Sequence, residues 1–184
     1  MNVDNLKIDL RSYSANRLRV AALLLGVMTA APAAAQQPTL HDQLLDNMEG
    51  AWVITGTIAH AATTHDLTAD WVMNHQYLRL HEVSRERDGA GRPRYEAMVF
   101  IGWVQASATY ACVWLDVFGG ITAESIGTAP RDGNRIAFAF ANHGHVTLRN
   151  TMTWHPESRS WDWQIVNVHG RRLSTFATLT LRHP

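Results

Sequence analysis

Two reactive side-chain types are almost missing from this chain of 184 residues. Lys7 is the only lysine and Cys112 is the only cysteine. A single cysteine can form neither an internal disulfide nor a thiolate metal site, so it is most simply a small buried hydrophobic residue. Schiff-base chemistry through a lysine is excluded from the body of the chain. Arginine blocks interleaved with aromatic residues are also missing, which argues against nucleic acid as a partner.

Long hydrophobic runs are equally scarce. The one clear run extends from Val20 to about Ala31 and is too short for a permanent membrane span. Basic residues precede it and small residues follow it: Lys7, Arg11, Arg17 and Arg19 before, Ala33 and Ala35 after. This order predicts a secretory signal peptide over residues 1–35, cleaved before Gln36, in preference to an uncleaved amphipathic anchor. We therefore expect an exported protein, periplasmic or secreted, with no membrane span.

The remaining chain is dominated by the alternation of apolar and polar residues. Only residues 36–49 carry leucines at helical spacing, which predicts one short helix. Period-two segments then occupy residues 51–60, 65–74, 76–87, 94–104, 109–118, 121–128, 134–142, 145–154, 160–168 and 172–181. The breaks between them contain Gly, Asn and Asp, the residues of hairpin turns. Residues 50–184 are therefore predicted to form one all-β domain, an antiparallel up-and-down barrel of about ten strands.

Tryptophan placement favours a closed sheet over an open one. The chain has seven tryptophans, spread over most of the predicted strands. An open, one-sided sheet would have to cover these rings with segments that the sequence lacks. A closed barrel of this size holds them partly inside and still leaves room for one small ligand.

Two local patterns resemble a known family. Gly50-x-Trp52, at the start of the first strand and just after a short helix, is similar to the signature of the lipocalin, or calycin, barrels. The segments "QYLRLHE" (76–82) and "FIGWVQASATYACVWLD" (100–116) resemble an uncharacterised bacterial lipocalin-like family, filed as a domain of unknown function. The resemblance covers nearly all of residues 45–182.

The resemblance implies a lipocalin-like fold and no particular reaction. In such barrels the tryptophan of the signature closes the floor, and an arginine of the last strand packs on it. Trp52 and Arg182 are the matching residues here. Family members commonly have an aspartate after the Gly-aromatic pair, whereas this chain has Val104 and then Gln105. That difference puts any role of this acid in doubt for the present chain.

The strand over residues 109–118 contains an unexpected acid. Tyr110, Cys112, Trp114 and Asp116 lie on one face of this strand. Asp116 has two interpretations. It either ends the strand at the barrel rim and accepts N–H bonds from the following glycine turn, or it faces the lumen as a polar anchor or general base.

Two further strands carry candidate ligand-binding residues. Arg79 shares a strand face with Tyr77 and His81, and either faces water or lines the cavity opposite Asp116. The family resemblance at Arg79 favours the cavity. Trp163 is one of two tryptophans on one face of the ninth strand, an arrangement that suits stacking of a flat or apolar ligand.

The leading hypothesis is a barrel that binds a small apolar or aromatic molecule in its lumen. The predicted ligand-binding residues are Arg79, Trp103, Tyr110, Trp114, Asp116 and Trp163. One alternative is an enzyme of the isomerase, cyclase or hydrolase type, with Asp116 and either Arg79 or a histidine such as His81 as an acid/base pair. The other is a haem or metal carrier using His143, His145 or His169. Because no further ligands occur at a persuasive spacing, neither a metal nor a cofactor is predicted.

Overall fold

The structure is a computed structural model that describes residues 40–184. The predicted signal peptide over residues 1–35 lies outside the described residues. The elements are α1 (Gln43–Asp46), β1 (Gly50–Ile58), β2 (Ala61–Val72), β3 (Tyr77–Ser84), β4 (Glu96–Val104), β5 (Thr109–Asp116), the 3₁₀ turn η1 (Ala123–Ser125), β6 (Ile126–Pro130), β7 (Arg135–Asn142), β8 (His145–His155), β9 (Ser160–His169) and β10 (Arg172–Arg182). Within the described part of the predicted helix 36–49, α1 covers only Gln43–Asp46. None of the helices in the described part is long and apolar enough to cross a membrane.

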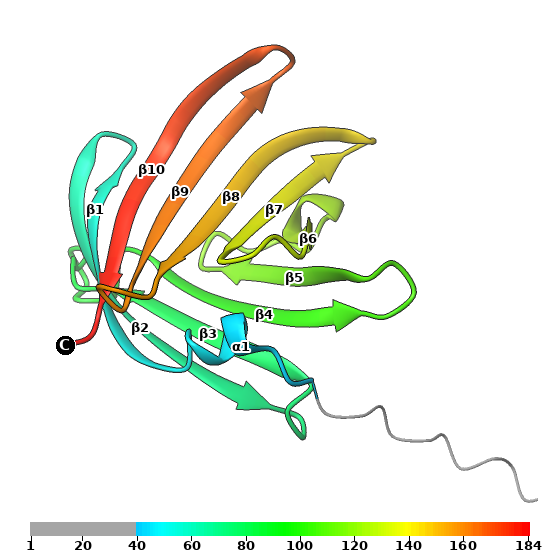
Figure 1. Cartoon of the computed structure of the whole chain (residues 1–184). Helices are drawn as coiled ribbons and strands as arrows, with labels where there is room; N and C mark the ends of the chain where they lie inside the picture. Colours follow the sequence, from blue (N-terminus) through cyan, green and yellow to red (C-terminus); the bar gives the residue numbers. More distant parts are fainter. Residues whose placement is uncertain (1–39) are drawn as a thin grey trace, which may run out of the picture. The chain divides into compact units, whose positions relative to one another are not determined.

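The ten strands form one closed antiparallel barrel (Figure 1). Each strand pairs with its neighbours in the sequence, and β1 pairs with β10 to complete the ring. The predicted fold class is thereby confirmed. One end of the barrel carries α1 and the turns after β2, β4, β6 and β8, and is called the helix end below. The turns after β1, β3, β5, β7 and β9 lie at the opposite end, called the far end.

The sixth strand differs most from its predicted position. The sequence pattern placed it at residues 121–128, whereas β6 begins only at Ile126. The Thr122 hydroxyl accepts a hydrogen bond from the Glu124 N–H at 3.2 Å, and the Ser125 hydroxyl accepts one from the Thr122 N–H at 3.2 Å. This capping box stabilises the 3₁₀ turn η1, so local side-chain hydrogen bonds replace the expected extended conformation.

Closure of the ring depends on a glycine. Gly56 of β1 pairs with Leu179 of β10 and has a φ of +151°. A Cβ atom added here would lie 2.1 Å from the carbonyl oxygen of Thr178, well inside van der Waals contact. Only glycine allows β1 and β10 to approach so closely.

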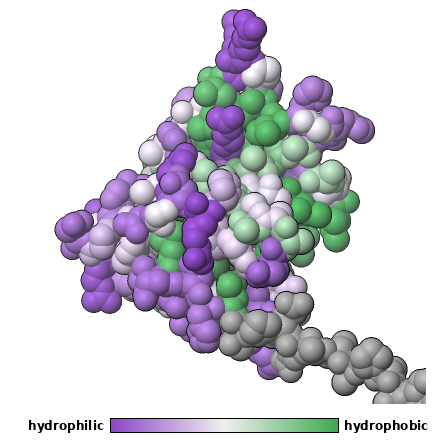
Figure 2. All heavy atoms as spheres, turned by 45° about the vertical axis from the view of Figure 1, so that its right-hand side comes forward, coloured by the Kyte–Doolittle hydropathy of each residue, from purple (hydrophilic) through white to green (hydrophobic). Residues whose placement is uncertain are grey.

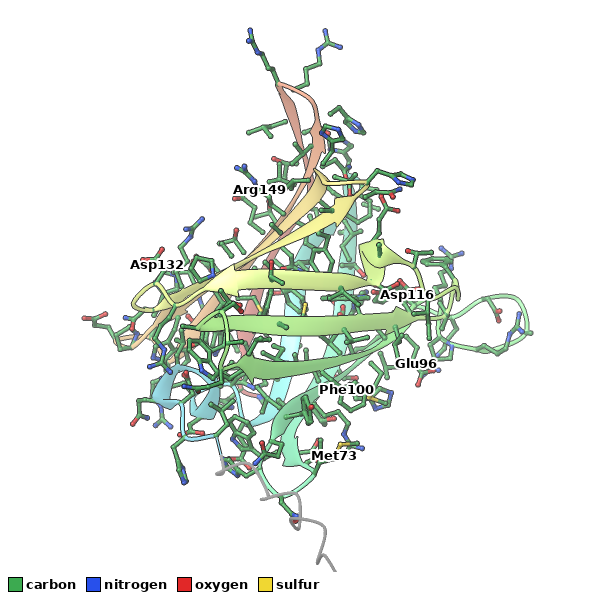
Figure 3. All side chains as sticks on the ribbon, turned by 90° about the vertical axis from the view of Figure 1, so that its right-hand side faces the viewer. Met73, Glu96, Phe100, Asp116, Asp132 and Arg149 are labelled. Atoms are coloured by element: carbon green, nitrogen blue, oxygen red, sulfur yellow. The ribbon has the colours of Figure 1, made fainter. Side chains whose placement is uncertain are left out.

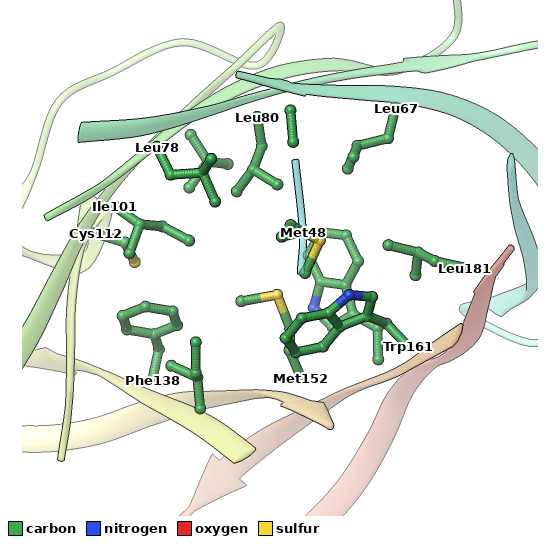
Figure 4. Close-up of a cluster of buried hydrophobic side chains, with 14 of the residues drawn as sticks. Met48, Leu67, Leu78, Leu80, Ile101, Cys112, Phe138, Met152, Trp161 and Leu181 are labelled. Atoms are coloured by element: carbon green, nitrogen blue, oxygen red, sulfur yellow. The ribbon is translucent and has the colours of Figure 1, made fainter. Parts of the chain in front are cut away.

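The core lies inside the ring, where alternate residues of every strand point inward. Figure 4 shows side chains from opposite sides of the barrel directed toward one another. Those labelled there are Met48, Leu67, Leu78, Leu80, Ile101, Cys112, Phe138, Met152, Trp161 and Leu181. All are at most 3% exposed. Burial raises the pKa of the Cys112 thiol to about 12, which keeps it protonated and unreactive.

Three tryptophans attach the helical segment to the barrel. The indole N–H of Trp52 donates to the carbonyl oxygen of Met48 at 2.7 Å, and that of Trp161 donates to the carbonyl of Asn47 at 3.3 Å. The indole of Trp71 donates to the Asp46 carboxylate at 3.1 Å. The helical segment therefore closes the helix end through hydrogen bonds at its C-terminus as well as through its leucines.

The predicted partner of Trp52 is wrong. Inward-facing Leu179 and Leu181 put the next residue, Arg182, on the outer face, where its side chain is exposed. His183, which follows β10, stacks on Trp52 instead. The two ring centroids are 3.9 Å apart, and the ring planes are 28° from parallel. Nδ1 of His183 lies 3.1 Å from the carbonyl oxygen of Ala51.

A buried carboxylate holds the start of α1. Asp42 is 3% exposed and caps the helix, accepting from the N–H groups of Leu44 and Leu45 at 3.0 and 3.1 Å. It also accepts from the Tyr110 hydroxyl at 2.6 Å and forms an ion pair with Arg131. Burial opposes ionisation, yet these donors together lower the pKa of Asp42. Burial and the Asp42 charge raise the pKa of Tyr110 to about 12.

Asp42→Ala should lower the free energy of unfolding by about 2–4 kcal/mol at neutral pH, because the helix cap is lost and Tyr110 loses its acceptor. The folded pKa of Asp42 is lowered, so this stabilisation is present above the unfolded pKa and is lost as the pH falls toward the folded value. Denaturant unfolding at neutral and acidic pH measures both effects. Asp132→Ala removes an exposed partner of Arg135 and should cost less than about 1 kcal/mol. Equal losses for the two variants would contradict this role of Asp42.

Candidate functional site

A second polar cluster lies inside the barrel, toward the far end. It consists of His65 on β2, Glu82 on β3, Tyr95 just before β4, and Trp114 on β5. Each belongs to the inward row of its strand: His65 precedes inward Leu67, and Glu82 follows inward Leu80. His65 and Glu82 are only 2% and 3% exposed. Groups that are charged or strongly polar are thus placed on the same wall as the apolar core.

The centre of the cluster is a buried histidine–carboxylate pair. Nδ1 of His65 lies 2.5 Å from Oε1 of Glu82. Nε2 of His65 lies 2.8 Å from the Thr63 hydroxyl, which donates to the Glu86 carboxylate at 3.3 Å. The Thr64 N–H donates to the same carboxylate at 3.0 Å. A continuous chain of hydrogen bonds therefore runs from the barrel interior to the far end.

The Thr63 hydroxyl lies between two acceptors. It has one proton to donate and is within hydrogen-bond distance of both Nε2 of His65 and the Glu86 carboxylate. Glu82, in turn, is held by His65 through a single oxygen.

Tyr95 connects this pair to the aromatic wall. Its ring stacks on that of His65 with centroids 5.7 Å apart, and its hydroxyl accepts from the indole N–H of Trp114 at 3.0 Å. Burial raises the pKa of Tyr95, and the negative charges of Glu82 and Asp116 raise it further. Both carboxylates therefore act on the same hydroxyl group.

Two of the predicted ligand-binding tryptophans meet in the lumen. Trp114 and Trp163 form an edge-on pair with ring centroids 5.7 Å apart. The indole N–H of Trp163 donates to the side-chain oxygen of the buried Asn150. Trp114 remains partly exposed whereas Trp163 is buried. The indole of Trp114 is thus partly accessible, and it contacts Trp163 of β9 across the lumen.

Asp116 lies at the end of β5, at the far end of the barrel (Figure 3). Its Oδ1 accepts from the N–H of Phe118 at 3.0 Å, and its carbonyl oxygen accepts from the N–H of Gly119 at 3.0 Å. These contacts agree with the rim interpretation. Its row on β5 points inward, so the same side chain stands at the mouth of the lumen.

Trp103 and Tyr110 lie elsewhere, at the helix end. The guanidinium of Arg131 sits over both rings, 5.3 Å from the Trp103 centroid and 5.9 Å from that of Tyr110. Arg131 also donates to the Tyr110 hydroxyl at 3.2 Å. Both aromatic residues therefore belong with Asp42 in the attachment of α1, away from Trp114 and Trp163.

The expected orientation of Arg79 is corrected by the structure. Leu78, Leu80 and Glu82 fill the inward row of β3, so Arg79 and His81 point outward. Arg79 makes a two-pronged contact with Asp70 of β2, at 3.0 and 2.9 Å, and its side chain is 41% exposed. His81 pairs with Glu96 at 2.8 Å on the same outer surface. The acid/base pairs proposed for Asp116 with Arg79 or His81 are therefore not assembled in the lumen.

The histidine hypothesis gains no geometric support. Among residues 40–184, no group of three His, Cys, Asp or Glu side chains is placed to hold a metal ion. His143 and His145 flank the exposed β7–β8 turn, and His169 is exposed at the end of β9.

Sequence reasoning assigned no place in the lumen to His65, Glu82, Tyr95 or Asn150. A signal was present in two of them. Glu82 follows the leucines of the inward row of β3, and His65 precedes Leu67 and Ala69 in the inward row of β2. A polar residue that ends an apolar row marks either a rim or a buried polar site. The register between strands decides which.

The lumen becomes accessible toward the far end. Ile58, Leu148, Ile165 and Asn167 belong to inward rows but are partly exposed. The inward residues nearer the helix end, such as Met152, are buried. The polar cluster therefore lies at the boundary between a filled lower core and a wall that solvent reaches.

Comparison of the sequence with the models of known protein families and with curated proteins gives no match.

Tyr95→Phe should destabilise the fold by about 1–3 kcal/mol, because the indole N–H of Trp114 loses its acceptor in a largely buried place. Because the pKa of Tyr95 is raised in the folded state, its hydroxyl proton is lost from the unfolded chain at a lower pH than from the folded protein. Stability of the wild type should therefore fall as the pH rises above about 10, and Tyr95→Phe should fall less steeply. A double-mutant cycle with Trp114→Phe isolates the hydrogen bond. Additive losses would show that the two residues do not interact.

Proposed function

We propose that this protein binds a small apolar or aromatic molecule in the barrel lumen, near the far end. The observation that carries the proposal is the convergence of Trp114, Tyr95 and the buried Glu82 on a wall that solvent reaches. Small-molecule sites combine aromatic side chains with a few well-placed polar groups in this way. The filled helix end supplies the rigid base of the site.

The free oxygens of the wall define the polar end of the ligand. One oxygen of Glu82 contacts His65, and one oxygen of Asp116 accepts from Phe118. Within the described residues, the other oxygen of each carboxylate makes no hydrogen bond. Both are hydrogen-bond acceptors next to aromatic rings. A ligand with a flat apolar body and a donor or positively charged group would satisfy both features.

The proposal extends to family and location. The Gly50-x-Trp52 pattern stands at the floor of a closed barrel, which supports a lipocalin-like carrier. The basic, apolar and small-residue order of the first 35 residues supports export to the periplasm or beyond.

Tryptophan fluorescence titrated with a matched ligand series tests the proposal. The series is 1-naphthylmethylamine, 1-methylnaphthalene and 1-naphthoate, which share the ring system and differ in charge. We expect the emission of Trp114 to change in a saturable way. The affinity should be highest for the amine. If none of the three gives a saturable change, and lipids and porphyrins give none either, the lumen is not a binding site.

Replacing the two carboxylates should reduce the preference for the amine. We expect Glu82→Gln to weaken amine binding by about tenfold or more, since a buried charged acceptor is lost. The rim residue should matter less, and Asp116→Asn should weaken binding about two- to fivefold. Neither change should affect binding of 1-methylnaphthalene. Asp162→Asn, on the exposed outer face of β9, is the control and should leave all affinities unchanged.

A further inference from the structure

The outer surface of β4, β5 and β6 is apolar, although a barrel strand needs only its inner row to be apolar. The sequence "AMVFIGWV" is hydrophobic on both faces, and the inward row is Val99, Ile101 and Trp103. The outward rows here define the outer β4–β6 face, which consists of Met98, Phe100, Ala111, Val113, Leu115, Val117 and Ile126. Figure 3 shows labelled Phe100 on this side of the barrel, with Glu96 nearer the far end.

These side chains are contiguous across three strands. Strand register places Met98 beside Leu115, Phe100 beside Val113, and Val113 beside Ile126. The Tyr77 ring extends the face, because it covers Gly102, whose missing Cβ would lie 2.8 Å from the ring. In Figure 2 this side is turned forward and shows hydrophobic surface among polar groups.

The opposite side of the barrel is built differently. The outward row of β8 is His145, Thr147, Arg149, Thr151 and Thr153, an ordinary polar exterior. On β5 and β6 the outward rows from Thr109 to Val117 and from Ile126 to Pro130 contain no charged side chain. A strand that is apolar on both faces is typical of a sheet covered on both sides. The outer β4–β6 face is therefore a candidate contact surface.

We propose that a second copy of this chain covers the outer β4–β6 face, related by a two-fold axis. Size supports this partner. Tyr77, Val117 and Ile126 at the border are 42%, 50% and 49% exposed, and Phe118 and Ile121 in the adjoining connection are 79% and 77% exposed. Together with the partly exposed centre they offer on the order of 500 Å² of apolar surface. With its polar margin, the face approaches the ~800 Å² per partner of a stable interface.

Charge also favours a copy of the same face. In a two-fold contact the same patch meets itself, so any net charge on it would be repelled. The face itself contains no charged residue, and on its β3 border Arg79 contacts Asp70 and His81 contacts Glu96. An anionic membrane or an acidic partner would instead need unpaired cations among these residues.

The relief of the face is self-complementary as well. A hollow of about 210 Å³ lies between Met98, Leu115, Asp116 and Val117, with the His81–Glu96 pair at its edge. Val117, at the edge of the hollow, is 50% exposed. A surface that carries both a hollow and a projecting apolar side chain can fit a second copy of itself.

Sedimentation velocity over a wide range of protein concentrations tests the proposal. We expect a monomer–dimer equilibrium in the wild type. Val113→Glu places a carboxylate at the centre of the face, where it would meet the same group of the partner, and should raise the dissociation constant about tenfold or more. Thr151→Glu, the matched change on the outward row of β8, should leave the equilibrium unchanged. Phe100→Thr, which keeps a strand-forming residue, should weaken the dimer and guards against misfolding of Val113→Glu.

Three results would overturn the proposal. The wild type could remain monomeric at every concentration. Val113→Glu and Thr151→Glu could alter a dimer equally, which would place the interface elsewhere. A monomeric wild type could instead bind neutral lipid vesicles in a manner abolished by Val113→Glu, which would assign the face to a lipid surface. Ligand titration of Val113→Glu and Phe100→Thr is independent of these outcomes, because both substituted side chains lie on outward rows.

Discussion

The pairing of β1 with β10 is the constraint on which the rest of the structure depends. Once the ring is closed, each strand has one row of residues inside the barrel and one outside. A register shift of one residue would move every side chain of that strand to the opposite face. Gly56 permits the closure by letting the Thr178 carbonyl approach where any Cβ would collide. The positions of His65, Glu82 and Trp114 in the lumen, and of Phe100 and Val113 outside, all follow from that single ring.

The two ends of the barrel use similar residue types for different purposes. At the helix end, Asp42 is saturated by backbone N–H groups, a tyrosine and an arginine, so it has no capacity left for a ligand. At the far end, Glu82 is held through one oxygen only and lies beside rings that solvent partly reaches. Saturation of the first carboxylate makes it structural, whereas the incomplete pairing of the second makes it the better candidate for recognition.

Sequence pattern predicted the strands well because period-two alternation and hairpin residues are local properties. Orientation can be predicted on β8, where apolar and polar residues lie on opposite faces. It failed on β3, where Arg79 and His81 alternate with leucines that end in Glu82. Leucines occupy the core in preference to an arginine that finds Asp70 across the outer surface.

Longer-range features of the site were beyond reach for a geometric reason. The contact of His65 with Glu82 joins residues on neighbouring strands, and its existence depends on register. Height along the barrel axis also separates Trp103 and Tyr110 from Trp114, although Tyr110 and Trp114 share a row on one strand. The sequence indicates whether a residue faces inward or outward. It does not indicate which residues of other strands lie at the same height along the barrel axis, because that depends on strand tilt and register.

The solitary thiol in the middle of the barrel has a practical meaning. Cys112 is 1% exposed, and burial raises the pKa of its thiol to about 12. Thiol reagents therefore cannot attack it while the ring is intact. Any modification at this position must follow separation of the strands around it. The rate at which Cys112 is modified thus reports local opening of the barrel, and a ligand bound in the lumen would lower that rate.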